Sequence, residues 1–334
     1  MKVIELRAYG GSEHFRETER PVPELRPGEV RIQLRAASFN PIDYQIRRGQ
    51  PGATLATPLI LGRDLSGVVD AVHGDVGGFQ LGDDVYAYIG KLASSGTYAE
   101  FVSVPAELIA KKPASLSHAE AAAVPVAAIT AGLALDKARA APGMSLFIAG
   151  GAGGVGTFAI GLARAMGVRD LMTTAGNTAS RDYLIDHCGL TDAQIVYYRA
   201  TGFVETALAR NGGGFDGVVD LVGVPMLPAC CRLLARDGNL ASVVDAPGKD
   251  DFELLFEKNA SFHAVGAHAY SLSPERNDWL RYRERLDQLA RQFDAKALGP
   301  PPITIVGPLS TATVRDAHHR MESNAVRGKL VMTF

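Results

Sequence analysis

The stretch FIAGGAGGVGTFAIGLARAMG, residues 147–167, decides the fold of this chain. An apolar run precedes its glycines and an amphipathic run follows them, as at the junction of a strand and a helix. Gly151, Gly153 and Gly156 keep the spacing G-x-G-x-x-G. This spacing permits a tight turn, a close approach of the backbone to a pyrophosphate, and close packing of the helix on the strand. It predicts a dinucleotide site at the N-terminus of the helix.

Strand and helix patterns alternate around this stretch. Six short apolar runs separated by amphipathic ones predict a parallel, doubly wound sheet with helices on both faces. The predicted strands are 145–150, 170–176, 194–199, 215–223, 239–245 and 261–268. The predicted helices between them are VGTFAIGLARAMG, SRDYLIDHCG, FVETALARN and VPMLPACCRLLAR.

Residues 1–110 follow a different pattern. Apolar and polar residues alternate by twos in EVRIQLRAASF, SGVVDAV, DVYAYIG and TYAEFVSVP, which predicts strands joined by long loops. Residues 116–138 have a helical pattern. After the six strands come a charged helix in PERNDWLRYRERLDQLARQF, a strand in PITIVGP, a helix in TVRDAHHRMES and a last strand in GKLVMTF.

Composition bounds the class of protein. The chain has 334 residues, of which 47% are hydrophobic, so it is long enough for about two domains. A formal net charge of -2 provides no attraction to nucleic acid or to an anionic membrane. No apolar run approaches the roughly 20 residues of a membrane span, and MKVIELRAYGG resembles a strand rather than a signal peptide. These features favour a cytoplasmic protein with no nucleic-acid or membrane partner.

The end of the second predicted strand bears on which dinucleotide binds. An NAD site usually places an acidic residue there for the ribose 2′-hydroxyl, whereas residues 173–181 here are TTAGNTASR. Asn177, Ser180 and the cationic Arg181 suit a 2′-phosphate, which favours NADPH over NADH. The alternative for Arg181 is an ordinary solvated position on the first turn of a helix.

Cysteine and histidine usage indicates no metal site. Cys188, Cys230 and Cys231 are too few and too badly spaced for a disulfide framework or a C-x-x-C metal site, and at least one of the adjacent pair is expected to be buried. His318 and His319 are neighbours on a predicted helix and point apart, so they are not expected to share a ligand.

The order of a strand-rich region followed by a nucleotide fold resembles the medium-chain dehydrogenase/reductase superfamily, over essentially the whole chain. In its zinc alcohol dehydrogenases, a Cys-x-x-Asp and a Gly-His-Glu segment supply metal ligands. The matching segments look like NPID at 40–43 and GRDLSG at 62–67, with Asn40 at the Cys position and Arg63 at the His position. These residues cannot replace a thiolate and an imidazole at zinc. The combination resembles the zinc-independent quinone oxidoreductases related to zeta-crystallin.

Other segments are similar to the same branch: VPVAAITAGLAL, AGGAGGVG, FDGVVDLVG and RGKLVM. The resemblance implies an α/β protein with a GroES-like strand-rich catalytic domain, residues 1–120 and 269–334. It also implies a Rossmann domain with a doubly wound six-stranded parallel sheet, residues 121–268, and cofactor contacts from Thr130 and Lys329. The predicted cofactor-binding residues are therefore Thr130, Gly151, Gly153, Gly154, Val155, Gly156, Asn177, Ser180, Arg181 and Lys329.

The predicted catalytic residues come from SFNPIDYQIRRG, which in this branch lines the cleft beside the nicotinamide. Asn40 is expected to donate its amide to a carbonyl, Tyr44 to donate its hydroxyl or deliver a proton, and Arg47 to stabilise an oxyanion or a cofactor phosphate. The alternatives are turn chemistry for Asn40 and packing for Tyr44. Asp43 is expected to fix the loop by accepting from backbone N–H groups.

The predicted reaction is hydride transfer from NADPH to a quinone or an α,β-unsaturated carbonyl, because an electron-poor acceptor mainly needs positioning and a few hydrogen-bond donors. The alternatives are a 2-enoyl thioester reductase and a non-catalytic NADPH-binding redox sensor. The resemblance also implies a homodimer formed by edge strands, here 261–268. Loops around 50–58 and 265–275 are expected to set the size of the substrate, and Gln50 replaces a Tyr common in the branch.

Overall fold

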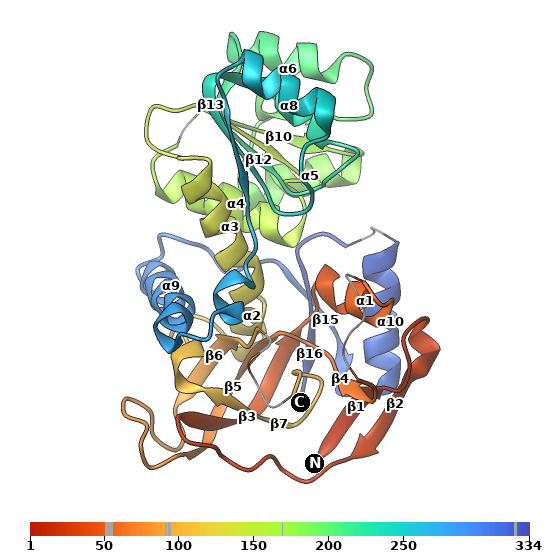
Figure 1. The fold of residues 1–334 in the computed structure, drawn as a ribbon, viewed down its shortest axis with the longest axis vertical. Coiled ribbons are helices and arrows are strands. Elements are labelled where there is room, and N and C mark those ends of the chain that lie inside the picture. Colours follow the sequence, from red (N-terminus) through yellow and green to blue (C-terminus); the bar gives the residue numbers. More distant parts are fainter. Residues whose placement is uncertain (51–55, 91, 93–94, 169, 324–325) are drawn as a thin grey trace. The chain divides into compact units, whose positions relative to one another are not determined.

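The structure is a computed structural model that describes residues 1–50, 56–90, 92, 95–168, 170–323 and 326–334. The chain forms two compact units. Unit 1 comprises Met1–Val126 and His268–Phe334, and unit 2 comprises Ala127–Ala267. In Figure 1, where colours follow the sequence, unit 1 therefore contains both the red start and the blue end of the chain.

A six-stranded parallel sheet forms the centre of unit 2. Its order is β11-β10-β9-β12-β13-β14, and every neighbouring pair is parallel. The strands are β9 (Leu146–Ala149), β10 (Leu171–Ala175), β11 (Ile195–Tyr197), β12 (Phe215–Asp220), β13 (Leu234–Ser242) and β14 (Ser261–Ala264). This strand order confirms the predicted doubly wound Rossmann sheet.

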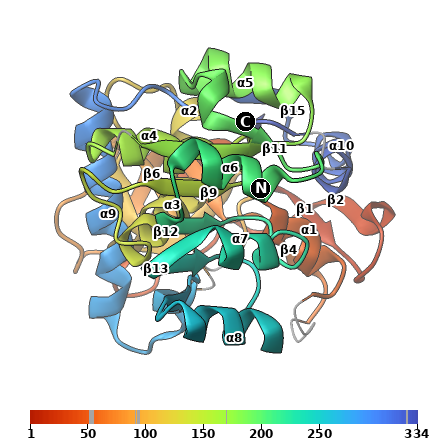
Figure 2. The same ribbon diagram turned by 90° about the horizontal axis from the view of Figure 1, so that it is seen from above.

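Helices lie on both faces of this sheet, as Figure 2 shows. They are α3 (Pro125–Lys137), α4 (Gly154–Ala165), α5 (Thr178–Cys188), α6 (Phe203–Asn211), α7 (Leu227–Leu233) and α8 (Lys249–Glu257). Every residue of β9 and β10 is buried, which explains their continuous apolar runs. The rings of Phe147 and Phe215 meet in the core with centroids 5.2 Å apart. Cys230 and Cys231 are both buried in α7.

Unit 1 is rich in strands, as predicted. Its larger sheet contains β3 (Glu29–Ser38), β5 (Asp64–Val72), β6 (Asp84–Tyr88), β7 (Phe101–Pro105), β8 (Ile109–Lys111), β15 (Ile303–Pro308) and β16 (Lys329–Thr333). A smaller sheet contains β1 (Lys2–Leu6), β2 (Phe15–Glu19) and β4 (Leu59–Ile60). The helices are α1 (Pro41–Arg47), α2 (His118–Ala122), α9 (Arg276–Asp294) and α10 (Thr311–Glu322). All of the paired strands are antiparallel except β15 and β16.

The structure differs from the predicted elements at several places. Strand β13 begins at Leu234, within a predicted helix, and β14 ends at Ala264 rather than at residue 268. The helical pattern of 116–138 divides into α2 and α3, because Pro125 has no N–H for a continuing helix and starts a new one. The predicted strand 194–199 ends at Tyr197, where the Ala200 N–H donates to the Tyr197 carbonyl and closes a turn. Helices α1 and α8 were not predicted, because both are short and neither has a long apolar period.

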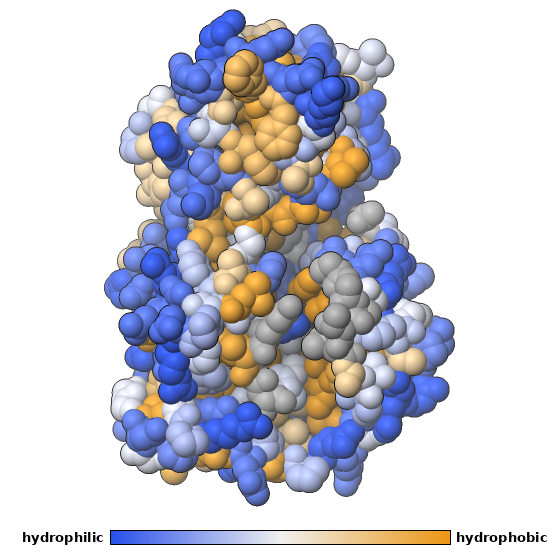
Figure 3. All heavy atoms as spheres, viewed as in Figure 1, coloured by the Kyte–Doolittle hydropathy of each residue, from blue (hydrophilic) through white to orange (hydrophobic). Residues whose placement is uncertain are grey.

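The surface contains exposed apolar side chains as well as charged ones. Phe256 of α8 is 88% exposed and Phe252 is 51% exposed. Figure 3 shows apolar residues among hydrophilic ones on the face of unit 2 that carries α8. Among the described residues, no helix has the length and apolar character needed to cross a membrane.

Candidate functional site

The glycine-rich loop joins β9 to α4, and three of its glycines are required by the fold itself. Gly150 has a φ of +90°, in the left-handed region. A Cβ on Gly151 would lie 2.2 Å from Thr173 Oγ1, and a Cβ on Gly156 would lie 2.3 Å from the Gly150 carbonyl oxygen. These contacts leave no room for a side chain, so the turn and the packing of α4 on β9 need glycine there.

Gly153 has a different environment. The nearest heavy atom to a Cβ at this position would be the Gly150 carbonyl oxygen, at 3.5 Å. A Cβ at Gly153 would therefore make one ordinary van der Waals contact and no clash, at the N-terminus of α4, whose first N–H groups have no acceptor within the helix. The absence of a side chain lets a ligand approach these N–H groups, and the positive end of the helix suits the negative charge of a pyrophosphate.

Two threonines of β10 hold the loop. Thr173 Oγ1 accepts from the Gly151 N–H at 3.1 Å and donates to the Ile148 carbonyl at 2.6 Å. Thr174 Oγ1 accepts from the Gly150 N–H at 2.9 Å. The sequence analysis did not identify this role, although two adjacent threonines in the buried run LMTTA are the signal.

The carboxyl end of β10 leads into Asn177, the N-cap of α5. Asn177 Oδ1 accepts from the Ser180 N–H at 2.9 Å and from the Ser180 hydroxyl at 3.1 Å. Arg181 pairs with two carboxylates. Its Nε and Nη2 donate to Asp192, and its Nη1 donates to Asp182 at 2.8 Å. These carboxylates raise the pKa of Arg181. The predicted contact of Arg181 with a 2′-phosphate stays a prediction.

In unit 1, Ser38, Asn40, Asp64 and Lys329 form a buried set of contacts, here called the Lys329 network. Lys329 Nζ donates to Asn40 Oδ1 at 2.5 Å and to the Phe39 carbonyl at 3.1 Å, and lies 3.6 Å from Asp64 Oδ2. Asn40 Nδ2 and Ser38 Oγ each donate to Asp64 Oδ2 at 2.8 Å. Burial raises the pKa of Asp64 and lowers that of Lys329, and the attraction between the two groups opposes both shifts.

The Lys329 network bears on whether a zinc ion fits this unit. Asn40 stands at the position of a ligand Cys, and its amide oxygen already accepts from an ammonium group. Asp64 is likewise satisfied by three hydrogen-bond donors, including the Val126 N–H at 2.8 Å. An ammonium beside two prospective ligands repels a second cation, so these residues do not suit zinc. No group of three His, Cys, Asp or Glu side chains suited to a metal ion occurs in the described part of the chain.

Helix α1 carries the other residues predicted to be catalytic. The Asn40 N–H donates to Asp43 Oδ2 at 2.9 Å, so Asp43 fixes the start of the helix as expected. Burial raises the pKa of Asp43 to about 6. Tyr44 is half-buried, with the Arg48 guanidinium 5.9 Å from its ring centroid.

Arg47 is buried within unit 1. Its Nη1 donates to the Gly10 carbonyl at 2.7 Å and its Nη2 pairs with Glu322 at the end of α10. Burial lowers the pKa of Arg47. Of the three residues predicted to be catalytic, Tyr44 is therefore the most exposed, whereas Asn40 and Arg47 are engaged in buried contacts.

Each unit contains part of the predicted site. Asn40, Tyr44, Arg47 and Lys329 belong to unit 1, whereas the glycine loop, the start of α5 and Thr130, which is buried on α3, belong to unit 2. Part of the loop expected to set substrate size, residues 51–55, lies outside the described residues.

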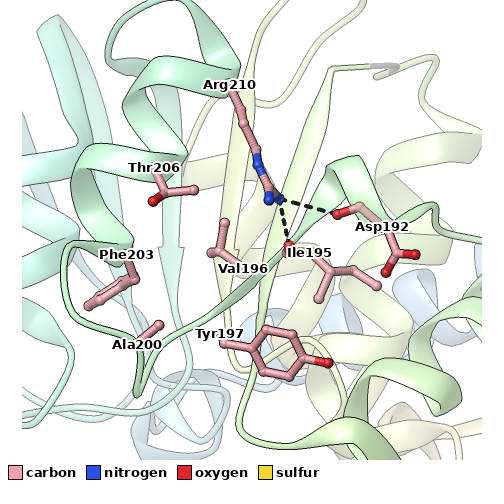
Figure 4. Close-up of a pocket in the computed structure, with 8 residues that line it drawn as sticks. All are labelled: Asp192, Ile195, Val196, Tyr197, Ala200, Phe203, Thr206 and Arg210. Atoms are coloured by element: carbon pink, nitrogen blue, oxygen red, sulfur yellow. Dashed lines mark hydrogen bonds between the residues drawn. The ribbon is translucent and has the colours of Figure 1, made fainter.

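A cavity of about 350 Å³ lies beside the edge strand β11 in unit 2. Figure 4 shows its lining, with Arg210 reaching across the strand end to the Ile195 carbonyl at 2.8 Å and the Asp192 carbonyl at 3.2 Å. None of the predicted cofactor residues lines it. The lining residues are Asp192, Ile195, Val196, Tyr197, Ala200, Phe203, Thr206 and Arg210.

Comparison with known proteins agrees with both units. Residues 26–114 match the alcohol dehydrogenase GroES-like domain, and residues 191–332 match the zinc-binding dehydrogenase family. The chain is 33% identical to the 2-methylene-furan-3-one reductase of Solanum lycopersicum over 262 residues, which are 72% of this chain and 67% of that protein. The chain belongs to the quinone oxidoreductase branch of the medium-chain dehydrogenase/reductase superfamily.

Other members of the superfamily extend this likeness over the whole chain. The mitochondrial NAD(P)H oxidoreductase RTN4IP1 of Danio rerio is 32% identical over 92% of this chain and 84% of its own length. The quinone oxidoreductase of Coxiella burnetii has a TM-score of 0.82 and 29% identity over 100% of this chain and 99% of its own. A mycobacterial protein solved with NADPH has a TM-score of 0.86 and 25% identity over the full length of both chains.

Proposed function

We propose that this chain is an NADPH-dependent reductase that transfers hydride to a quinone or an α,β-unsaturated carbonyl. The observation that carries the proposal is the uncrowded position of Gly153, beside the first N–H groups of α4, in a loop where Gly150, Gly151 and Gly156 are required by backbone conformation or by packing. A 2-methylene-furan-3-one reductase and a quinone oxidoreductase among the similar proteins support the acceptor classes, and the neighbour solved with NADPH supports the cofactor.

The bound nicotinamide would supply the hydride. The chain's own residues have other tasks. The α4 N-terminus binds the pyrophosphate, and Thr173 and Thr174 keep the loop in shape for it. In unit 1 the Lys329 network holds the Asn40 amide in one orientation, because its nitrogen and its oxygen are both engaged. Groups held in this way need no rearrangement when charge develops on a substrate.

Tyr44 is the residue we assign to the acceptor oxygen. Tyr44 is half-buried and follows Asp43 in helix α1. A hydroxyl there can donate a hydrogen bond to the oxygen that gains negative charge, or deliver the proton that completes reduction of an enone. For a quinone, whose product oxyanion is delocalised, the hydrogen bond alone suffices.

The test is the rate of NADPH oxidation by the purified protein, with a small quinone or a small enone as acceptor, NADH as the control cofactor and a chelator present. We expect turnover with NADPH, less with NADH, and no effect of the chelator. Tyr44→Phe should lower kcat more with the enone than with the quinone, because the hydroquinone anion takes its proton from water on oxygen, whereas the more basic enolate is assigned the proton of Tyr44. Saturable NADPH binding without turnover of either acceptor would contradict the reductase assignment. Loss of activity in the presence of the chelator would contradict the conclusion that Asn40 and Asp64, beside Lys329, do not bind zinc.

A further inference from the structure

We propose that Arg199, rather than Arg181, recognises the 2′-phosphate of the cofactor and thereby sets the preference for NADPH. This inference rests on the proposed function, since only an enzyme that uses NADPH needs such a residue. The contact of Arg199 with the 2′-phosphate is separate from the contact of the pyrophosphate with the α4 N-terminus at Gly153, so the two contacts can be tested by different variants.

Arg199 lies past the carboxyl end of β11. The strand ends at Tyr197, which is level with Ala175, the last residue of β10. The Tyr198 N–H donates to the Ala175 carbonyl at 3.2 Å, so the turn that carries Arg199 is attached to the end of β10. In a doubly wound sheet, ligands bind outside the carboxyl ends of the strands.

Tyr198 connects Arg199 to the start of α5. A Cβ on Gly176 would lie 3.0 Å from Tyr198 Cε1 and 3.1 Å from its hydroxyl oxygen, so the ring lies against Gly176. The Arg199 guanidinium lies 5.5 Å from the centroid of the same ring. The same aromatic ring therefore contacts both the Arg199 guanidinium and Gly176, the residue that follows the second strand of the sheet.

The two arginines near this end differ in charge environment. Arg181 directs donors to Asp192 and Asp182, and these two carboxylates more than neutralise it. Arg199 is exposed, and no ion pair with a carboxylate involves it within the described part of the chain. Residues 171–181 include no Asp or Glu that would bind the ribose of NADH or repel a phosphate. An unpaired guanidinium is the stronger phosphate ligand, because Arg181 would first have to give up Asp192.

The experiment compares Arg199→Gln with the matched variant Arg181→Gln. Calorimetry would measure the Kd of each protein for NADPH, for NADH, and for the fragments 2′,5′-ADP and 5′-AMP. We expect Arg199→Gln to weaken NADPH and 2′,5′-ADP by about tenfold or more, as for loss of a charge-assisted contact, while NADH and 5′-AMP stay within about twofold. Arg181→Gln should leave the ratio of the NADPH and NADH Kd values within about twofold of wild type, because its charge is already neutralised.

Loss of the 2′-phosphate preference in Arg181→Gln but not in Arg199→Gln would overturn the inference while leaving the proposed function in place. Equal affinity of the wild type for 2′,5′-ADP and 5′-AMP would overturn both the inference and the NADPH preference in the proposed function. A wild-type protein that binds neither NADPH nor NADH would overturn the proposed function as well. Both arginines are at least partly exposed, so far-ultraviolet circular dichroism and thermal unfolding should match the wild type in both variants.

Discussion

At the scale of single residues, the polar groups of unit 1 are held by one another. Lys329 and Asp64 are both at most 5% exposed, and each has hydrogen-bond partners beyond the ion pair itself. Buried charges persist when they are paired and hydrogen-bonded, since an unpaired one costs several kcal/mol. The Lys329 network therefore keeps Asn40 in place. Lysine serves at position 329 because its ammonium group both pairs with Asp64 and donates to Asn40.

Asp43 is the buried carboxyl whose titration should be measurable. Burial raises its pKa from 3.8 to about 6, so between these values the folded state binds more protons than the unfolded state, and stability falls as the pH rises. Asp43→Asn keeps an acceptor for the Asn40 N–H and does not ionise. We therefore expect the wild type to lose up to about 3 kcal/mol of stability relative to the variant between about pH 4 and pH 6.5.

Urea unfolding of both proteins across this pH range would measure the difference. Asp186→Asn, at an exposed position on α5, is the control and should run parallel to the wild type. A difference between wild type and Asp43→Asn that does not change with pH would show that Asp43 titrates at the same pH in both states.

At the scale of elements, the loop between β9 and α4 uses glycine for two physical reasons. Gly150, Gly151 and Gly156 are needed by backbone conformation or by close packing. Gly153 is required neither by backbone conformation nor by packing. Its role is to leave the N–H groups at the helix N-terminus accessible to a ligand. A sequence motif alone does not distinguish these two uses.

Alanine at two positions of this loop should therefore have opposite effects. Gly153→Ala should lose at most about 1 kcal/mol of stability, as for alanine at a helix N-cap, but should weaken NADPH binding by about tenfold or more, because its Cβ stands where the phosphate approaches the N–H groups. Gly156→Ala should lose about 1–3 kcal/mol of stability, because its Cβ meets backbone at 2.3 Å and the helix must shift. Urea unfolding and NADPH titration of both variants make the comparison. Unchanged NADPH affinity in Gly153→Ala would show that the pyrophosphate binds elsewhere.

At the scale of the whole molecule, we propose the homodimer that the sequence analysis expected at 261–268. In that range β14 is the last strand of the sheet and is paired on one side, with β13. The Val265 N–H donates to Ser242 at the end of β13, so by the alternation of a parallel strand the Ala264 N–H points away from β13. An unpaired strand edge is available to the same edge of a second copy.

Ala264→Pro tests this dimer. Proline removes the outward N–H without removing a bond to β13, so we expect a shift from dimer to monomer in sedimentation velocity with unit 2 still folded. Ala264→Ser, which keeps the N–H, should remain dimeric. A wild-type protein that sediments as a monomer, or an Ala264→Pro variant that remains a dimer, would contradict pairing through this edge.

The fold could be predicted from the sequence because strands, helices and the glycine loop depend on patterns within short segments of the chain. Short apolar runs separated by amphipathic ones identified all six strands of the Rossmann sheet, and the glycine spacing placed the loop between β9 and α4. The sequence analysis missed α1 and α8, whose few residues provide little periodicity. The strand was predicted to continue through residue 199, because aromatic residues continue past Tyr197, where pairing with β10 stops. The turn that contains Tyr198 and Arg199 was therefore not predicted.

The sequence by itself determined the two architectures, the dinucleotide loop and the replacement of zinc ligands by Asn40 and Arg63, because these depend on residue type and on spacing along the chain. Only the tertiary structure decided which polar groups meet. Lys329 reaches Asn40 from the far end of the chain, and Arg181 pairs with Asp192 while Arg199 remains beside Tyr198. A charged side chain acts through its neighbours in space, and these come from segments that no pattern along the chain connects.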